Sequence, residues 1–126
     1  MKKLTVIILP EILGVCRLES GVPFPDWLHE SSNFFALIGT VDETSIVCRE
    51  DLIPAGCPFE KEFRALKVKG PLGFSLTGVL ASLLTPLAEA GISVFTLSTY
   101  ETDYILVKQE HLEKAIRALR SIANII

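Results

Sequence analysis

The stretch GPLGFSLTGVLASLLTPLAEAG, residues 70–91, decides the fold of this chain. It opens with a glycine-rich segment and continues into apolar residues spaced as on one face of a helix. These residues are Leu76, Val79, Leu80, Leu83, Leu84, Leu87 and Ala88. Ser75 is the predicted N-cap and Gly91 the predicted stop. The stretch therefore predicts an amphipathic helix that follows a glycine-rich loop.

The sequence on either side of this stretch predicts strands. Arg64–Lys69 alternates in polarity, as a half-buried strand does. Ile92–Thr99 and Asp103–Lys108 are rich in β-branched and aromatic residues and predict a hairpin. A second amphipathic helix begins near Leu112, and the final "NII" predicts a short last strand. The order β-α-β-β-α-β is that of a ferredoxin-like unit.

The N-terminal half is rich in strands and contains no long helical pattern. Strands are predicted at Leu4–Leu9, Gly14–Leu18, Phe34–Val41 and Ser45–Arg49, and residues 50–62 are predicted to be a linker. Trp27 lies in a proline-flanked turn, and we expect it to plug the sheet face that a helix would otherwise cover.

A shift of 60 residues aligns the two halves without a gap. Phe35 then meets Phe95, Glu43 meets Asp103, and Ile46 meets Leu106, among others. The series predicts two copies of one small unit, residues 1–60 and 61–126. We therefore expect an α+β fold of two ferredoxin-like (βαββαβ) units, with antiparallel sheets, helices on one face, and a helix-poor first unit.

Composition narrows the class of protein. With 49% hydrophobic residues, 21% charged residues and a net charge of −3, the 126-residue chain can form a packed core and has no basic patch for nucleic acid. The start "MKKLTVIILPEILGV" imitates a signal peptide, but Pro10 and Glu11 interrupt it, so we expect a strand there. No apolar run approaches the ~20 residues of a membrane span. Three cysteines without metal-ligand spacing favour free thiols in a reducing cytoplasm.

The glycine-rich loop admits two interpretations. It matches neither GxGxxG nor GxxxxGK[ST], its lysines lie upstream on the strand, and Pro71 removes a backbone donor, so a nucleotide site is disfavoured. Free N–H groups at a helix start do favour an anion such as a carboxylate. The loop is therefore either a ligand site or only a turn that Ser75 caps, and the residues alone leave both open.

Catalytic chemistry finds no support in the sequence. Glu101 and Asp103 are a carboxylate pair, but turn ends collect such residues for local hydrogen bonds. His29 and His111 have no Cys, Ser or Asp at a motif spacing, and Ser75 is not in a GxSxG elbow. We expect no enzyme activity, no cofactor and no metal. A contact from Asp103 to a cationic ligand group, an amine or guanidinium, stays open.

The segments SLTGVLASLLTPLAEAGIS and STYETDYILV resemble the ACT-domain family, and VCRLESGVPFPDW and DETSIVCRE extend the resemblance over almost the whole chain. In particular, the chain is similar to small bacterial tandem-ACT proteins related to the regulatory region of aspartate kinase. It also resembles the ACT repeats of a eukaryotic arginine sensor. One position departs from the pattern: Gly73 stands where an acidic residue is expected.

The resemblance implies regulation by a small effector, with an amino acid as the expected ligand. The ligand-binding residues that it implies are Leu72, Gly73, Phe74, Ser75, Leu76, Thr77 and Gly78, faced by Ile92, Ser93 and Val94, with Asp103 approaching from the hairpin. The alternatives are a structural or interaction module with a vestigial ligand site, and an uncharacterised enzyme using the same cleft. Edge strands and half-covered sheets predict a cytoplasmic homodimer.

Overall fold

A computed structural model describes residues 4–30, 34–70 and 78–126, and the side chains of these residues apart from positions 29 and 30. The chain forms two compact units. The N-terminal unit is Glu11–Phe63, and the C-terminal unit is Met1–Pro10 together with Arg64–Ile126. The first strand of the chain therefore belongs to the C-terminal unit. Strand β5 (Phe59–Val68) contributes its first half to one unit and its second half to the other.

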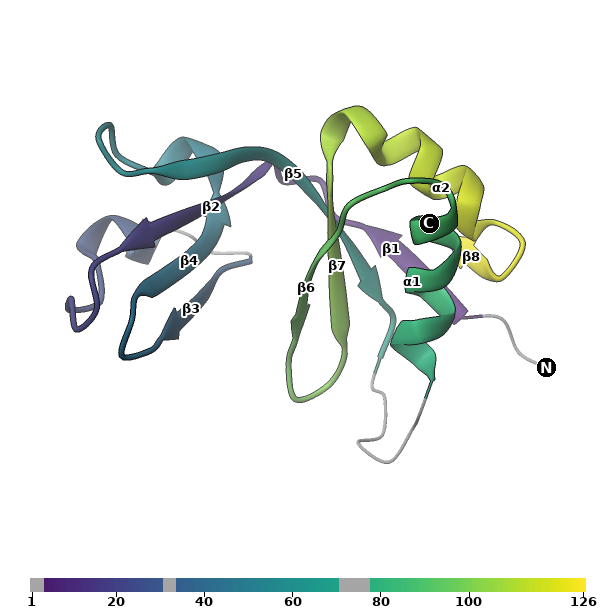
Figure 1. Ribbon diagram of the computed structural model, residues 1–126, viewed down its shortest axis with the longest axis horizontal. Helices are drawn as coiled ribbons and strands as arrows, with labels where there is room; N and C mark the ends of the chain where they lie inside the picture. Colours follow the sequence, from purple (N-terminus) through teal and green to yellow (C-terminus); the bar gives the residue numbers. More distant parts are fainter. Residues whose placement is uncertain (1–3, 31–33, 71–77) are drawn as a thin grey trace. The chain divides into compact units, whose positions relative to one another are not determined.

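The C-terminal unit follows the predicted β-α-β-β-α-β order. After β5 come α1 (Val79–Glu89), β6 (Phe95–Ser98), β7 (Asp103–Lys108), η3 (Gln109–His111), α2 (Leu112–Leu119) and β8 (Ala123–Ile125). The strands lie in the order β6-β7-β5-β1-β8. Strand β1 (Leu4–Ile8) runs antiparallel to β5 and parallel to β8, so it separates the first and last strands of the motif. Figure 1 shows this arrangement.

The two helices of the C-terminal unit share one core with the sheet. Leu83 and Leu87 of α1 and Leu119 of α2 have no exposed surface. They belong to one buried cluster with residues of four strands, namely Val6, Leu66, Val68, Ile105, Val107 and Ala123. Because strand residues two apart point to the same face, both helices cover one side of the sheet. This confirms the predicted layer order.

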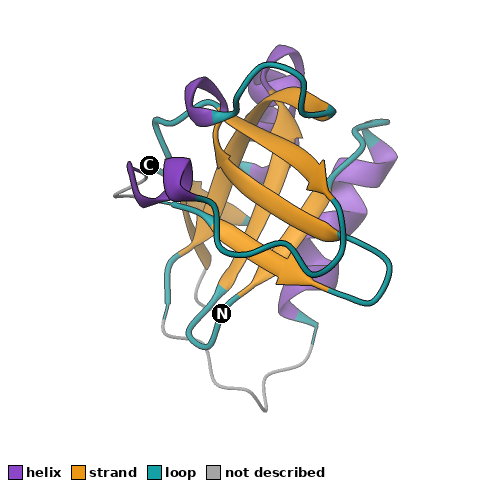
Figure 2. Cartoon of the chain, turned by 90° about the vertical axis from the view of Figure 1, so that its left-hand side faces the viewer, coloured by secondary structure: helices purple, strands orange, loops and turns teal. Residues whose placement is uncertain are grey.

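The N-terminal unit repeats the strand order with almost no helix. It contains β2 (Leu13–Leu18), η1 (Asp26–Glu30), β3 (Ala36–Gly39), β4 (Thr44–Arg49), η2 (Glu50–Leu52) and the first half of β5. The strands lie in the antiparallel order β3-β4-β2-β5. The short 3₁₀ turn η1 lies between β2 and β3, where the other unit has α1 between β5 and β6. After η2 the chain runs into β5, where the other unit has α2 after η3 (Figure 2). The expectation of a helix-poor ferredoxin-like first unit is confirmed.

Trp27 helps to close the core of the N-terminal unit. Cys16, Leu28, Ile46 and Cys48 form the buried cluster, and Trp27 packs against it. A large aromatic ring therefore fills space that a longer helix would otherwise fill. This agrees with the predicted plug.

Several predicted boundaries differ from the structure. Residues 59–62, predicted as linker, open strand β5, where Phe59 pairs with Cys16. The sequence FEKE hides this strand because its side chains are mostly charged and exposed. Helix α1 begins at Val79 with Gly78, not Ser75, as its N-cap. Strand β6 begins at Phe95 rather than Ile92.

The internal repeat is real in the two hairpins, but its offset is 59 residues rather than 60. Strand β4 and turn η2 become β7 and η3 when 59 is added to every residue number. The pairing of Ala36 with Val47 becomes the pairing of Phe95 with Leu106. A slip of one residue moves every side chain to the other face. The true offset aligns Ile46 with Ile105, each of which lies in the core of its own unit.

Candidate functional site

The candidate site is the end of the C-terminal unit where β5 leads into the glycine-rich loop. The predicted ligand-binding residues Leu72, Gly73, Phe74, Ser75, Leu76 and Thr77 lie outside the described residues. The structure does describe both flanks of the loop, Gly70 and Gly78. The site must therefore be built from these flanks and from the elements that hold them.

Gly78 sets the start of helix α1. Its φ of +78° is left-handed, and the Ser82 N–H donates to its carbonyl at 2.9 Å, which begins the helix. Among the described residues, a Cβ at Gly78 would meet nothing within 4 Å. Glycine is therefore required here by the backbone conformation rather than by crowding. The residue that precedes the helix therefore has a backbone conformation that few residues other than glycine adopt.

The end of β5 is held from two sides. The Lys69 N–H donates to the Thr5 carbonyl of β1 at 2.8 Å. On the other side, the Thr102 hydroxyl donates to the Val68 carbonyl at 2.5 Å. Thr102 is only 5% exposed, so this hydrogen bond is largely shielded from water. The end of β5 that leads into the loop is therefore hydrogen-bonded on both sides up to Lys69.

Thr99 and Thr102 also close the turn between β6 and β7. The Thr99 N–H donates to the Thr102 carbonyl at 2.8 Å, and the Thr102 N–H donates to the Thr99 hydroxyl at 3.3 Å. The sequence analysis did not identify these residues. The available signal was the threonine at each end of a four-residue turn, a position where a hydroxyl commonly satisfies the backbone.

Asp103 is half-buried at the start of β7, directly after this turn. The Ser98 hydroxyl donates to its Oδ1 at 2.6 Å, and the two residues are register partners in the hairpin. The local hydrogen bond that a turn residue would make is therefore present. A carboxylate can accept about four hydrogen bonds in all, so this bond leaves acceptor capacity for a ligand.

The predicted residues do not all lie at the same end of the unit. Ile92, Ser93 and Val94 follow the C-terminal end of α1, after Gly91 with φ +75°. With eleven residues, α1 is about 16 Å long. Figure 1 shows α1 beginning at the end of the unit that holds the β6–β7 turn, and the segment from α1 to β6 crossing the opposite end. Gly78 and Asp103 therefore share an end, and residues 92–94 do not.

Residues 92–94 also differ in exposure. Ile92 is 5% exposed, belongs to the core, and donates its N–H to the Leu87 carbonyl at 3.0 Å. Ser93 and Val94 are exposed. Ile92 thus has a structural role, and a ligand contact at these positions stays a prediction.

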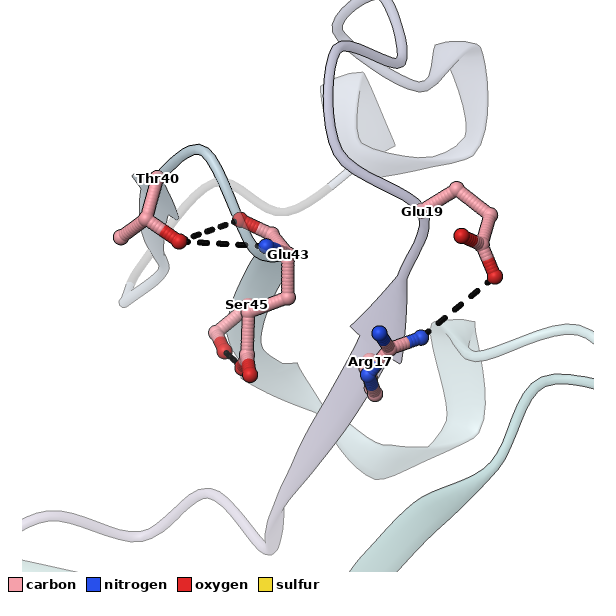
Figure 3. A network of polar contacts seen from close by, with 5 residues as sticks. All are labelled: Arg17, Glu19, Thr40, Glu43 and Ser45. Carbon is pink, nitrogen blue, oxygen red and sulfur yellow. Dashed lines mark hydrogen bonds and ion pairs between the residues drawn. The ribbon is translucent and has the colours of Figure 1, made fainter.

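The N-terminal unit carries a polar turn of the same design. Thr40 Oγ1 donates to the Glu43 carbonyl and accepts from the Glu43 N–H, both at 3.1 Å. The Ser45 hydroxyl donates to Glu43 Oε1 at 2.6 Å (Figure 3). Nearby, Arg17 and Glu19 form an exposed ion pair at 3.5 Å, which contributes little to stability. Each unit therefore pairs a serine with an acid at the base of a threonine-closed turn.

Two of the three thiols, those of Cys16 and Cys48, are protected by burial. Cys16, Cys48 and Cys57 are free, as the sequence predicted, and the first two are buried. Burial, reinforced by neighbouring Cys16 and Asp51, raises the pKa of Cys48 to about 12. Burial and then Cys57 raise the pKa of Cys16. Thiols held neutral in this way are poor nucleophiles and poor metal ligands.

Charged groups elsewhere form a local pair. Arg49 donates to both carboxylate oxygens of Asp51, at 3.1 and 3.0 Å. These hydrogen bonds lower the pKa of Asp51 and raise the pKa of Arg49.

Within the described parts of the chain, no three His, Cys, Asp or Glu side chains group to hold a metal ion. In the same parts, no helix has both the length and the apolar character of a membrane span.

Comparisons with protein families match both units. A family model described as an ACT domain matches residues 59–121. A second model, described as an N-terminal domain, matches residues 11–56.

Comparisons with individual proteins agree with these matches. Subunit 1 of the cytosolic arginine sensor for mTORC1 from Bos taurus is 32% identical over 97 residues, which is 68% of this chain and 30% of the bovine protein. The chain thus spans less than a third of that relative's length. A crystal structure of an Agrobacterium tumefaciens protein has a TM-score of 0.91 at 31% identity, over 100% of this chain and 94% of that one.

The fold also occurs in enzyme regulation. The ligand-free regulatory subunit of aspartate kinase from Thermus thermophilus has a TM-score of 0.67 at 12% identity, over 96% of this chain and 99% of that one. Identity this low indicates a shared fold only.

Proposed function

Because this chain belongs to the ACT-domain family, we propose that it is a non-catalytic regulatory protein that binds a small effector, an amino acid. Binding changes the packing of its domains and thereby signals to a target. The coarser statement, a regulatory domain that binds a small ligand, follows from the family and from the similarity to an amino-acid sensor.

The observation that carries the proposal is the position of Asp103 beside the hydrogen-bonded end of β5. The hydroxyl of Thr102 fixes the end of β5 to the β6–β7 turn, and the loop between Gly70 and Gly78 begins at that end. Asp103 follows Thr102 directly and presents a half-buried carboxylate. A carboxylate on a rigid element can bind a ligand with little loss of conformational entropy.

The chemistry of this end suits a zwitterion. Asp103 offers acceptors for an amine or guanidinium. The start of α1 favours a carboxylate, since the first N–H groups of a helix point outward at the positive end of its dipole. An amino acid carries both groups. The resemblance of the chain to a protein named as an arginine sensor supports testing cationic amino acids first.

We place the protein in the cytoplasm as a homodimer, in keeping with its reduced thiols and the edge strands of its sheets. Under this proposal the protein uses no cofactor or metal and binds neither nucleic acid nor a membrane.

The first experiment is a thermal-shift screen of the full chain with the twenty amino acids, followed by calorimetry on any hit. A ligand at 100 times its dissociation constant adds about 2.7 kcal/mol to the free energy of unfolding. We expect an amino acid with a cationic side chain to raise the melting temperature. If no amino acid changes it, the sensor proposal fails.

Three variants separate a ligand contact from a turn residue. Ser98→Ala removes the hydroxyl that donates to Asp103, whereas Asp103→Asn keeps a side-chain oxygen that can still accept this hydrogen bond. Only Asp103→Asn removes the charge, so it should abolish the thermal shift while Ser98→Ala keeps it. Glu101→Gln, two residues away and exposed, is the charge-matched control. Equal shifts in all three variants would show that Asp103 acts only in the turn.

The second candidate is a structural or interaction module with a vestigial ligand site. Gly73 favours it, because the acidic residue expected from the family pattern is missing there. A protein that binds no amino acid but retains a stable, specific oligomer would support this alternative.

A further inference from the structure

Two stretches of chain join the units, one at residues 10–11 and one at residues 63–64, inside strand β5. Hydrogen bonds fix both stretches where they belong to the C-terminal unit. The Arg64 guanidinium donates to the Leu9 carbonyl from Nη2 at 2.9 Å and from Nε at 3.3 Å. The Leu9 N–H donates to the Ala65 carbonyl at 3.0 Å. The C-terminal unit therefore holds its own ends of the two connections firmly.

In the N-terminal unit, a single residue ties the two stretches together. The Glu50 N–H donates to the Ile12 carbonyl at 2.9 Å, just before β2. Glu50 Oε1 accepts the Glu62 N–H of β5 at 2.8 Å. A hydrogen bond to a carboxylate is roughly twice as strong as one between neutral groups. The side chain of Glu50 is therefore a strong but removable contact to β5.

Glu62 has a backbone conformation that is rare for a residue with a side chain. Its φ is +65°, and in the described parts of the chain it is the one residue other than glycine with a positive φ. Strand β5 also bulges here. The register between β2 and β5 shifts between Leu13 and Val15, so Gly14 alone faces residues 61 and 62. The strained residue thus lies in the bulge, directly before the connection between the units.

A permanent bulge needs no strained residue, because glycine adopts a positive φ at little cost. The chain uses glycine at its other described left-handed positions, namely Gly21, Gly56, Gly78 and Gly91. At Glu62 the conformation is instead supported by the hydrogen bond to Glu50. Strained residues persist only where their surroundings enforce them, and they gather at switch regions. Loss of this bond would allow Glu62 to become extended, which changes the direction in which β5 leaves the N-terminal unit.

The part of β5 that begins at Glu62 ends at the candidate site. Residues 62–69 span about 23 Å in an extended conformation. At the far end, the Lys69 N–H donates to the Thr5 carbonyl and the Thr102 hydroxyl donates to the Val68 carbonyl. A displacement of this end by a bound ligand therefore acts on Glu62 through one continuous strand.

We propose that Glu62 is the hinge between the two units and that Glu50 is the latch that holds it in the left-handed conformation. Effector binding at the end of β5 breaks the hydrogen bond between Glu50 and Glu62, Glu62 becomes extended, and the orientation of the units changes. This inference rests on the proposed function and names the conformational change by which the effector signals.

The first test asks whether Glu62 is strained. Glu62→Gly should keep or raise the urea midpoint, because glycine adopts this φ freely. Glu60→Gly is the matched control in the same strand, at a position whose φ is not positive, and it should lower the midpoint. Equal losses in the two variants would overturn the latch.

The second test measures the orientation of the units in the ligand-free chain by residual dipolar couplings. One alignment tensor should fit both units in the wild type, in Glu50→Gln, which keeps an acceptor oxygen, and in the charge-matched control Glu60→Ala. Glu50→Ala and Glu62→Gly should lose this common tensor. If both variants keep it, Glu50 has only a structural role and the hinge is overturned. Glu62→Gly keeps the test decisive if Glu50→Ala does not fold.

Addition of L-arginine distinguishes the hinge from the proposed function. We expect L-arginine to shift the NMR signal of the Glu62 amide and to change the tensor of one unit relative to the other. If L-arginine raises the melting temperature while the Glu62 signal stays in place, the hinge is overturned and the proposed function stands. If none of the twenty amino acids binds but Glu50→Ala and Glu62→Gly lose the common tensor, the hinge stands and the proposed function fails.

Discussion

Thr40 and Thr99 close the two hairpins of this chain with the same hydrogen bonds. In each turn the threonine N–H donates to the carbonyl of the residue three positions later. The distance is 2.9 Å from Thr40 to Glu43 and 2.8 Å from Thr99 to Thr102. In each, the threonine hydroxyl also accepts from the N–H of that residue, at 3.1 and 3.3 Å. The two units therefore share not only a strand order but also a turn, residue by residue.

Thr40→Val and Thr99→Val test this equivalence. Valine keeps the β-branched shape and removes the hydroxyl that accepts a backbone N–H, so each variant should lower the free energy of unfolding by about 0.5–1.5 kcal/mol. Chemical denaturation with urea gives the values. Thr96→Val, at an exposed strand position, is the control and should have little effect. A large loss for Thr40→Val with none for Thr99→Val would mean that the turns are alike only in shape.

The periodicity of residues 64–126 was sufficient to predict the order of helices and strands in this segment, although not that β1 joins its sheet. The stripe that runs from Leu76 to Ala88 predicted a helix, which the structure shows as α1 from Val79 to Glu89. Asp103–Lys108 was predicted with the bounds that the structure gives β7. These elements are long, amphipathic and bounded by turn residues. The strong local signal agrees with the tertiary structure there, as expected for a natural sequence.

Other features depend on pairing that a sequence pattern does not reveal. Residues 59–62 are charged and exposed, so only their pairing with β2 makes them a strand. The repeat offset was wrong by one residue because apolar residues such as Ile46 and Val47 are adjacent, and both Leu106 and Ile105 are plausible partners. Only the hairpin register distinguishes the two alignments.

The candidate site was predictable only in part. Gly78 and Asp103 lie at one end of the C-terminal unit, but Ile92–Val94 follow the other end of α1. The sequence placed residues 92–94 on a strand facing the loop, whereas β6 begins only at Phe95. Thr102, which ties the turn to β5, escaped notice because its partner is a backbone carbonyl 34 residues away.

Thr102→Val should destabilise the C-terminal unit more than either turn variant above. The substitution removes the buried donor to the Val68 carbonyl and leaves that carbonyl without this partner. An unsatisfied buried polar group costs about 1–3 kcal/mol. Thermal and urea unfolding give the loss, and hydrogen exchange at Lys69 reports whether the end of β5 loosens. Thr102→Ser, which keeps the hydroxyl, should retain most of the stability. If the serine and valine variants lose the same amount, the methyl packing of Thr102 matters and its hydrogen bond does not.

Gly78→Ala should destabilise the protein through the backbone alone. The φ of +78° costs a residue with a Cβ about 1–2 kcal/mol, although no atom of the described residues lies within 4 Å of the added Cβ. Gly39→Ala is the matched control, because its Cβ also has no neighbour within 4 Å in the described parts of the chain and its φ is not left-handed. Gly78→Asn should lose less than Gly78→Ala, since asparagine tolerates this region. Urea denaturation measures all three free energies. Equal losses at positions 39 and 78 would contradict the conformational explanation.

Cys48 should make the protein sensitive to alkali. Its pKa rises from an ordinary value near 9 to about 12 in the folded state, chiefly because the thiol is buried. Between these two pH values the unfolded chain releases a proton that the folded chain keeps. The ionisation of Cys48 therefore leaves the free energy of unfolding unchanged below pH 9. As the pH rises toward 12, the free energy of unfolding falls by up to about 1.4 kcal/mol per pH unit for this group.

Urea denaturation at a series of pH values from 7 upward measures the slope. Cys48→Ala should be less stable at pH 7 but should show a shallower alkaline decline, while Cys57→Ala, at a half-buried thiol, should keep a decline as steep as that of the wild type. Parallel curves for Cys48→Ala and the wild type would show that ionisation of Cys48 does not limit alkaline stability.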